Sequence, residues 1–305
     1  MSRLGFDLSQ SAPDNKDLVF RVVETMIDFF SGPEPRVFAH RGASARAPEN
    51  TLESFRLARN AGAPYLELDV HLTGDGRLVV IHDSSVARTT GKRGRVENMK
   101  LEAIRKLDAG CRFTPDRGRT FPYRGRGLVV PTLDEVLESF PDARLTIEVK
   151  RSREGIVEAV VDTIRRFAAL DRVIVASHED ALVRRVRAVE PRLLTSFGKR
   201  EVRQFLSGVR RRDLDGYRPP GRALQVPEYF GLRRVVSPSF IETAHGLGLE
   251  VHVWTVNEPI HIQRLLDWGV DGIMTDDPAK AFATVEALNG NARASVVTGD
   301  AVGSP

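Results

Sequence analysis

The sequence predicts an α/β fold, a (β/α)₈ barrel of the TIM type, and two observations support this prediction. Short apolar segments alternate with helical patterns over most of the 305 residues, which is typical of a parallel sheet. About eight such repeats indicate that the sheet closes on itself, and barrels of roughly 250 residues fold as single domains. The hydrophobic content of 41% is sufficient for one large core.

The predicted strands are short, and helices connect most of them. The strand candidates are Val37–Ala39, Tyr65–Leu72, Leu78–Ile81, Leu145–Val149, Val173–Ala176, Leu193–Ser196, Ala223–Val226, Glu250–Trp254 and Gly272–Thr275. The helical patterns are Thr51–Asn60, Lys100–Leu107, Thr132–Ser139, Gly155–Ala169, Glu179–Val189, Phe240–Gly246 and Pro259–Trp268. Thr51 is expected to be the N-cap of the first of these helices.

One strand candidate exceeds the eight positions of the barrel, so either one arm of a hairpin lies outside the barrel or another candidate is false. Tyr65–Leu72 and Leu78–Ile81 are separated by a short segment containing Asp75-Gly76, a pair typical of two-residue hairpin turns. That turn places Asp69 opposite His82, and directly opposed residues share a face of the sheet. A register change of one residue would put them on opposite faces.

Three regions are predicted along the chain. Residues 1–35 form an N-terminal extension with an amphipathic helix, residues 36–288 form the barrel with an insertion at about 84–131, and residues 289–305 form a disordered tail. The helix is expected to pack on the domain or to cap a barrel end. Contact with a membrane surface or a partner is the alternative. No secretory signal or transmembrane segment is recognisable, so a cytoplasmic location is expected.

The net charge of +4 favours an acidic partner such as a small phosphorylated substrate. Because the charges are spread along the chain, no nucleic acid is expected as a partner. The Arg-Gly loop at 116–127 has three interpretations: a lid or rim near an anionic substrate, a solvated loop, or an RNA- or DNA-binding segment. The single cysteine excludes an intrachain disulfide.

Polar residues at predicted strand ends are the candidate site residues. His40 and Arg41 follow the first strand; a histidine can transfer protons near neutral pH, and an arginine can bind phosphate oxygens. Glu67 and Asp69 are two apart in a strand and therefore share a face. Paired carboxylates with apolar neighbours are typical of hard-metal ligands, although an exposed strand of alternating polarity is the alternative.

Two further candidates follow the same logic. His82 ends the second hairpin strand, where a structural histidine is the alternative interpretation. Glu148 and Lys150 alternate with apolar residues in the next strand, so they would be costly to bury unless they bind a metal and a phosphate. An ion pair between them is the alternative, but their separation of about 6–7 Å along the strand argues against it as the only reason.

These motifs resemble those of glycerophosphodiester phosphodiesterases, in the same order along the chain. The segments that carry the resemblance are 40–42, 48–51, 67–70, 82–83, 147–150, 253–257 and 269–276. The resemblance implies a barrel, dependence on a divalent cation (Mg²⁺ or Ca²⁺), and hydrolysis of glycerophosphodiesters to glycerol 3-phosphate and an alcohol. By the same resemblance, His40 and His82 are the acid–base pair, and Glu67, Asp69 and Glu148 are the metal ligands.

The resemblance also assigns residues that contact the substrate. Arg41 and Lys150 correspond to phosphate contacts, Trp254 to a wall of the substrate pocket, and Glu49 to a residue that supports the metal site. A core aromatic is the alternative for Trp254. The chain departs from the family at His178, where an aromatic residue is frequent.

Two other functions remain open from the sequence. A lysophospholipase D-like phosphodiesterase would use the same histidines, carboxylates and metal with a different lipid pocket. A non-catalytic protein that binds phosphate or a phospholipid headgroup is the second, although the presence of both histidines argues against it. The sequence does not indicate the released alcohol, the acid and base roles or the oligomeric state.

Overall fold

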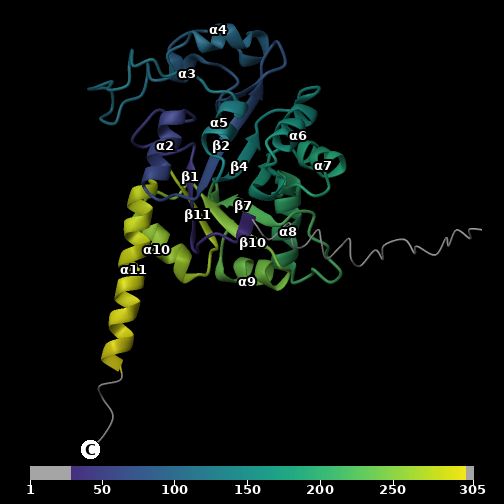
Figure 1. The fold of residues 1–305 in the computed structure, drawn as a ribbon. Helices are drawn as coiled ribbons and strands as arrows, with labels where there is room; N and C mark the ends of the chain where they lie inside the picture. Colours follow the sequence, from purple (N-terminus) through teal and green to yellow (C-terminus); the bar gives the residue numbers. More distant parts are fainter. Residues whose placement is uncertain (1–28, 300–305) are drawn as a thin grey trace, which may run out of the picture.

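The computed structural model describes residues 29–299 and has the predicted barrel at its centre (Figure 1). The barrel strands are β1 Arg36–His40, β2 Tyr65–Leu72, β4 Arg144–Val149, β5 Val173–Ala176, β6 Leu194–Thr195, β7 Ala223–Pro227, β10 Glu250–Trp254 and β11 Gly272–Thr275. They are all parallel, in the order β6-β5-β4-β2-β1-β11-β10-β7. A parallel bridge between Ser196 and Ala223 joins β6 to β7 and closes the ring.

Helices cover the outside of the barrel and connect its strands (Figure 1). They are α2 Leu52–Asn60, α5 Leu133–Ser139, α6 Ile156–Arg166, α7 Asp180–Val189, α8 Lys199–Arg211, α9 Pro238–Gly246, α10 Pro259–Asp267 and α11 Pro278–Gly299. Thr51 is the N-cap of α2, as predicted: its side chain accepts a hydrogen bond from the backbone of Ser54, whose hydroxyl accepts one in return. Helix α8 has no counterpart among the sequence predictions.

Alternation along β2 divides its side chains between two environments, as predicted. Leu66, Leu68 and Val70 point outward and belong to the large apolar core under the helices. Tyr65 points inward and packs with Phe38 inside the barrel. Glu67 and Asp69, also inward, lie further along the strand, so the polar site is formed at the carboxyl ends of the strands.

The first two described residues of the N-terminal extension, Phe29 and Phe30, are helical and close the opposite end of the barrel. Phe29 is fully buried, and its ring lies 5.5 Å from that of Tyr65. Tyr65 Oη donates a hydrogen bond to the carbonyl of Phe29. The rest of the predicted amphipathic helix lies outside the described residues.

The insertion after the hairpin forms a small layer beside the barrel, drawn at the top of Figure 1. It contains α3 Ala87–Thr90, α4 Leu101–Arg105 and the 3₁₀ turn Val96–Asn98; a second 3₁₀ turn, Leu170–Arg172, lies elsewhere in the chain. The apolar cluster of the insertion includes Val86, Val96 and Ile104. The predicted helix Lys100–Leu107 is therefore present but shorter.

The hairpin exists, but its predicted register is wrong by one residue. Strand β3, Leu78–Val80, pairs antiparallel with β2 so that Val70 lies opposite Val80. The Thr73 amide donates to the Arg77 carbonyl, which leaves a three-residue loop with Gly76 at a φ of +75°. In hairpins with three-residue loops, the third loop residue typically has a left-handed backbone conformation. The Asp-Gly pair therefore fits this loop as well as a two-residue loop.

Two more differences from the predictions concern the end of the chain and β7. Helix α11 continues to Gly299 and thus includes residues 289–299 of the tail predicted to be disordered; alanines, strong helix formers, recur in this segment. Residues 300–305 lie outside the described part. After β7, a short hairpin of β8 Tyr229–Phe230 and β9 Arg233–Arg234 extends from the barrel. Within the described residues, no helix combines the length and apolarity that crossing a bilayer requires.

Candidate active site

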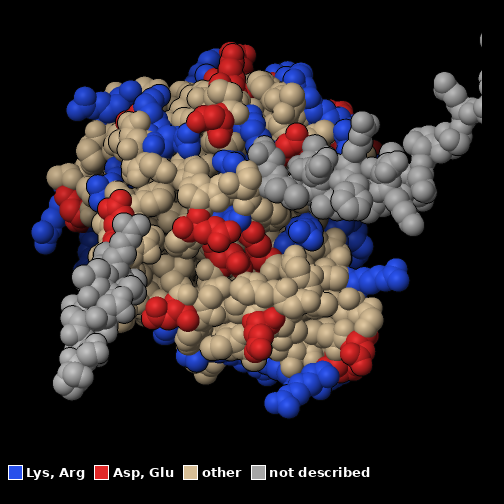
Figure 2. Space-filling view, turned by 60° about the horizontal axis from the view of Figure 1, so that its bottom comes forward, with Lys and Arg blue, Asp and Glu red and all other residues tan. Residues whose placement is uncertain are grey.

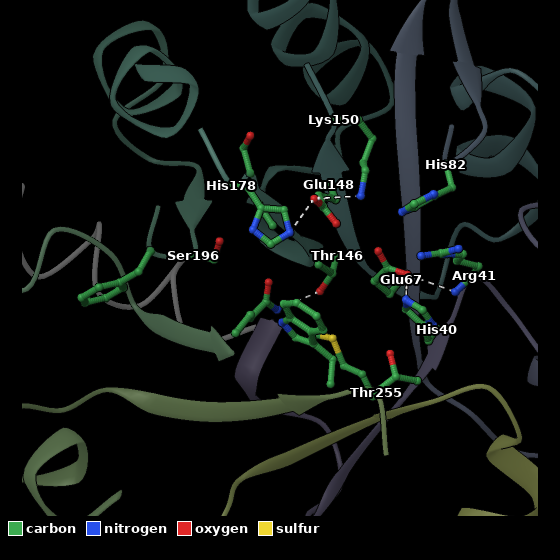
Figure 3. A pocket seen from close by; sticks show the side chains of 16 residues that line it. His40, Arg41, Glu67, His82, Thr146, Glu148, Lys150, His178, Ser196 and Thr255 are labelled. Atoms are coloured by element: carbon green, nitrogen blue, oxygen red, sulfur yellow. Dashed lines mark hydrogen bonds and ion pairs between the residues drawn. The ribbon is translucent and has the colours of Figure 1, made fainter. Parts of the chain in front are cut away.

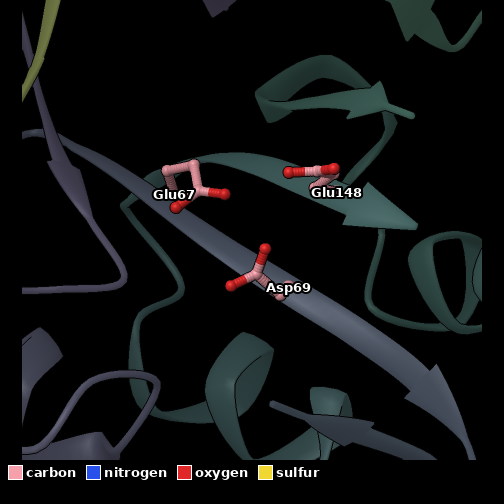
Figure 4. Close-up of side chains that lie close together, drawn as sticks. All are labelled: Glu67, Asp69 and Glu148. Atoms are coloured by element: carbon pink, nitrogen blue, oxygen red, sulfur yellow. The ribbon is translucent and has the colours of Figure 1, made fainter. Parts of the chain in front are cut away.

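Three carboxylates from two neighbouring strands converge at the carboxyl end of the barrel (Figure 4). Glu67 and Asp69 are on β2, and Glu148 is on β4 directly beside Asp69 in the strand register. One oxygen from each lies within 4.8 Å of the others. Glu67 and Asp69 are only 4% and 1% exposed. Asp69 Oδ1 and Glu148 Oε1 are buried, and the cluster as a whole offers carboxylate oxygens, the ligands that suit a hard divalent cation.

The charges of this cluster are strongly coupled. Burial, followed by the proximity of Asp69, raises the pKa of Glu67 to about 8. Burial would also raise the pKa of Asp69, but Lys150, Arg41 and His82 together hold it below its usual value. Without a bound cation, the site therefore retains a proton on Glu67 at neutral pH, because three adjacent carboxylates repel one another.

Two cations lie against the carboxylates. Lys150 Nζ is 3.0 Å from Glu148 Oε1 and 3.3 Å from Asp69 Oδ1. The ion pair between Lys150 and Glu148, the alternative interpretation, is thus present, because the long lysine side chain folds back over the strand. It is not the only contact of Lys150, which also lies against Asp69. Arg41 Nε is 3.1 Å from Asp69 Oδ2, and its Nη1 donates to Glu49 Oε1 at 3.0 Å. Both cations therefore lie directly beside the carboxylate cluster.

His40 lies at the end of β1, with one ring nitrogen on an aspartate. Its Nδ1 is 2.7 Å from Asp276 Oδ1, and its Nε2 is 3.9 Å from Glu67 Oε2. Burial lowers the pKa of His40, but the hydrogen bond to Asp276 and the charge of Glu67 outweigh this effect and raise the pKa above its usual value. Ser44 and Asn257 also donate to Asp276, which fixes this carboxylate and therefore the ring orientation of His40.

His82 reaches the same pocket in spite of the register change, because β3 ends at Val80 and the chain then turns. The Ile81 amide donates to the Asp69 carbonyl, and His71 Nε2 lies 3.0 Å from the His82 carbonyl. The Nδ1 atom of His82 is 2.7 Å from Asp83 Oδ1. Both histidines are therefore held through Nδ1 by a carboxylate, which leaves each Nε2 for the ligand.

Arg88, in α3 of the insertion, joins the two sides of the site. It donates to both oxygens of Glu49 at 2.6 and 2.7 Å, and its Nε donates to Asp83 Oδ2 at 2.7 Å. Burial tends to raise the pKa of Asp83, but Arg88 and His82 hold it at about 2. Since Glu49 also accepts from Arg41, one continuous network runs from Arg41 to His82.

These side chains line a cavity of about 140 Å³ (Figure 3). His40, Arg41, Glu67, His82, Glu148 and Lys150 are among the lining residues, as is Trp254. The ring of Trp254 packs edge-on against His178 at 5.8 Å, and His178 Nε2 lies 3.5 Å from Glu148 Oε1. Trp254 also packs on the inner core, as the alternative interpretation of this residue predicted. Glu49 is not part of the carboxylate cluster; it holds Arg41 and Arg88.

The sequence interpretation missed the residues that support the two histidines. Asp276 lies in a recognised motif and follows a predicted strand, so its position at the active edge could have indicated it. Asp83 directly follows His82. Asn50 also lies in a recognised motif, although its partner, Asp69, is 19 residues away. Arg88 lies outside every recognised motif, and its partner, Glu49, is 39 residues away.

The site thus combines a parallel barrel with a cluster of three carboxylates, two histidines that each lie against a carboxylate, and two adjacent cationic side chains. The model of the glycerophosphoryl diester phosphodiesterase family matches residues 40–280. The glycerophosphodiester phosphodiesterase of Caldanaerobacter subterraneus subsp. tengcongensis is 36% identical over 247 residues, 79% of this chain and 94% of that protein. The chain therefore belongs to the glycerophosphodiester phosphodiesterase family, as the sequence motifs indicated.

Solved structures agree with this assignment. A glycerophosphodiester phosphodiesterase from Agrobacterium tumefaciens superposes with a TM-score of 0.66 at 28% identity, covering 81% of this chain and 99% of that chain. An Oleispira antarctica phosphodiesterase in complex with its product sn-glycerol-3-phosphate superposes with a TM-score of 0.70 at 25% identity, covering 85% and 99%. The predicted barrel is thus confirmed.

Proposed function

We propose that this protein hydrolyses glycerophosphodiesters to glycerol 3-phosphate and an alcohol, with His40 and His82 as the acid–base pair. The observation that carries the proposal is the matched arrangement of the two histidines. Each has Nδ1 at 2.7 Å from an aspartate, and both line the cavity that contains the carboxylates. A carboxylate on Nδ1 fixes the tautomer whose Nε2 can accept a proton, and it stabilises the imidazolium once formed.

A divalent cation, Mg²⁺ or Ca²⁺, is part of this proposal, with Glu67, Asp69 and Glu148 as its ligands. The support is the all-oxygen donor set, whose atoms lie within 4.8 Å of one another, and the burial of Glu67 and Asp69. When bound, such an ion would neutralise the charge that develops on phosphate oxygens. Arg41 and Lys150 would orient the phosphate from the sides, and Trp254 would form the wall beside the glycerol.

The division of labour between the histidines follows from the bond that breaks. One Nε2 accepts a proton from the nucleophile, which is water or the 2-hydroxyl of the substrate glycerol. The other donates a proton to the departing alkoxide, which is a poor leaving group at neutral pH. With water as the net reactant, hydroxide is added to phosphorus and a proton to the alcohol.

Replacing either histidine tests the proposal. His40→Ala and His82→Ala should each lower kcat for glycerophosphocholine by roughly 10²- to 10⁴-fold, the usual contribution of a general acid or base. His261→Ala, at an exposed position of α10, is the control and should keep full activity. Near wild-type turnover by both folded variants would refute the assignment.

A substrate that releases p-nitrophenol separates acid from base. This leaving group departs without protonation, so the variant that lacks the general acid should recover most of its activity on it, whereas the other variant should not. Recovery by neither variant, or by both, would contradict a division into one acid and one base.

A further inference from the structure

The candidate active-site cavity continues into a second, larger cavity on one side. This groove has a volume of about 700 Å³, and it shares His178, Phe197, Gln225 and Trp254 with the smaller cavity. The four shared residues form the boundary between the two spaces. A ligand whose phosphate lies over the carboxylates can therefore extend past Trp254 without leaving the protein surface.

The groove lies between α8 and the β8–β9 hairpin, and its inner surface is largely apolar. Val202 and Leu206, one helical turn apart on α8, form one wall. Val226 and Val235 lie at the base of the hairpin, and Phe230 lies on the hairpin itself. The hairpin is held to α8 by Lys199 and Arg203, whose cationic groups lie 5.4 and 5.9 Å from the centre of the Phe230 ring.

The rim of the groove is basic. Lys199, Arg203, Arg210 and Arg233 line it, and none of its described lining residues is acidic. An apolar interior with an uncompensated cationic rim matches a ligand that has a hydrocarbon chain next to an anionic group. A small polar alcohol such as choline would leave the apolar walls in contact with water.

The hairpin tip supports the same ligand class. Leu232 is fully exposed, Phe230 is 57% exposed and Tyr229 is 42% exposed. Among the described residues, only one other large apolar side chain, Ile260, is strongly exposed. Arg233 and Arg234 follow directly. Apolar residues flanked by arginines are typical of segments that contact a lipid surface with anionic headgroups.

We propose that the groove binds the single acyl chain of a lysophospholipid whose phosphodiester lies in the active-site cavity, with the hairpin tip at the surface of the lipid aggregate. This proposal rests on the proposed function and names its substrate class. The chemistry is unchanged: the bond from phosphorus to the headgroup alcohol breaks, water supplies the new oxygen and the proton of the alcohol, and the product is an acylated glycerol phosphate.

The test is a series of substrates that differ only in chain length. Glycerophosphocholine is compared with 1-acyl lysophosphatidylcholines of roughly 6, 8, 10 and 12 carbons at concentrations below micelle formation. Each buried methylene should lower KM by about fourfold at most, with kcat nearly constant, until the groove is filled. Hydrolysis of glycerophosphocholine with a KM that does not improve along the series would overturn the groove proposal alone; hydrolysis of no member would refute the proposed function itself.

Variants locate the chain-binding site. Leu206→Ser and Phe230→Ser should flatten the dependence of KM on chain length, each judged against its own KM for glycerophosphocholine. Ile260→Ser removes an equally exposed apolar side chain away from the groove (68% exposed) and should keep the full dependence. A dependence that persists in both groove variants would place the acyl chain elsewhere and overturn the assignment.

Discussion

The protonation of Glu67 depends on whether the site holds a cation. Its carboxyl group is buried beside Asp69 and Glu148, and its pKa is raised to about 8. Burial and like charges favour the protonated form, while a bound cation would favour the ionised form. The ionised carboxylate of Glu67 thus lowers the stability of the protein when no cation is bound. When a cation compensates its charge, the same carboxylate can serve as a ligand.

This coupling predicts a pH-dependent affinity for divalent cations. Between pH 4.5 and about 8 the folded, metal-free protein keeps a proton that the unfolded chain has released, so its stability falls as pH rises through this window. Cation binding must displace that proton. The apparent affinity for Mg²⁺ or Ca²⁺ should therefore rise about tenfold per pH unit up to pH 8 and then level off.

Calorimetric titration in two buffers of different ionisation enthalpy would measure the released proton directly. Close to one proton per bound ion is expected at pH 7, and Glu67→Gln should release none. An affinity that is constant between pH 6 and 9, without proton release, would contradict the role of Glu67 as a ligand.

The connection between β1 and α2 has an unusual backbone conformation at two consecutive residues. Arg41 and Gly42 have φ values of +58° and +84°. A Cβ atom at Gly42 would lie 2.4 Å from Ser54 Oγ and 2.6 Å from the Ser54 carbonyl carbon. The positive φ and the close approach of α2 together restrict the position to glycine.

Gly42→Ala should therefore destabilise the protein more than the same change at a left-handed glycine in open space. Gly62 has a φ of +91°, and no atom lies within 4 Å of the position that a Cβ would take there, so Gly62→Ala should cost about 1–3 kcal/mol from backbone strain alone. Gly42→Ala should cost roughly 1–3 kcal/mol more because of the overlap. Urea unfolding would compare them, and equal costs would show that the contact with Ser54 is easily relieved.

The insertion acts on the site through one residue, Arg88. Its contacts with Glu49 and Asp83 fix the partners of Arg41 and His82. Arg88→Ala should lower kcat by about 10- to 100-fold, the usual effect of displacing a reacting group by about 1 Å. Arg88→Lys should restore little, since a lysine cannot bind two carboxylates in this bidentate manner.

The matched control is Arg93→Ala, an exposed arginine of the same insertion. It should leave kcat unchanged. Full activity of Arg88→Ala would show that Asp83 and Glu49 hold the site residues without help from the insertion.

The barrel brings together residues that are distant in the sequence. His40, Glu67, Glu148 and Asp276 come from β1, β2, β4 and the end of β11, and they meet because parallel strands end at the same edge. The alternating strand pattern predicted that His40, Glu67 and Glu148 converge, whereas Asp276 was not predicted. Each of these strands is short and apolar, so packing in the folded barrel adds to the preference of the local sequence for a strand.

Other features depended on geometry that the sequence does not encode locally. Asp75-Gly76 suits loops of two or three residues, so it could not fix the register that places Asp69 opposite Ile81. Helix α8 was missed because its charged residues obscure the spacing of Val202 and Leu206. The groove depends on how α8 and the β8–β9 hairpin face each other, which no local pattern contains.

The charged side chains on one face of the molecule are arranged unevenly. On the face shown in Figure 2, acidic side chains gather near the centre and basic side chains lie mainly toward the edges. The net charge of +4 therefore does not form one continuous basic surface on this face. A duplex or a long single strand of nucleic acid would require such a surface.

The most direct test of the proposed chemistry is the release of glycerol 3-phosphate from a panel of glycerophosphodiesters carrying choline, ethanolamine, glycerol or inositol. The protein is treated with EDTA, and Mg²⁺ or Ca²⁺ is then added back. We expect turnover to fall at least about 100-fold with EDTA and to return with the cation, and we expect no return in Glu148→Gln. Full turnover in EDTA would contradict the carboxylate cluster as a cation site, and no release from any substrate by the folded, cation-bound protein would contradict the proposed function.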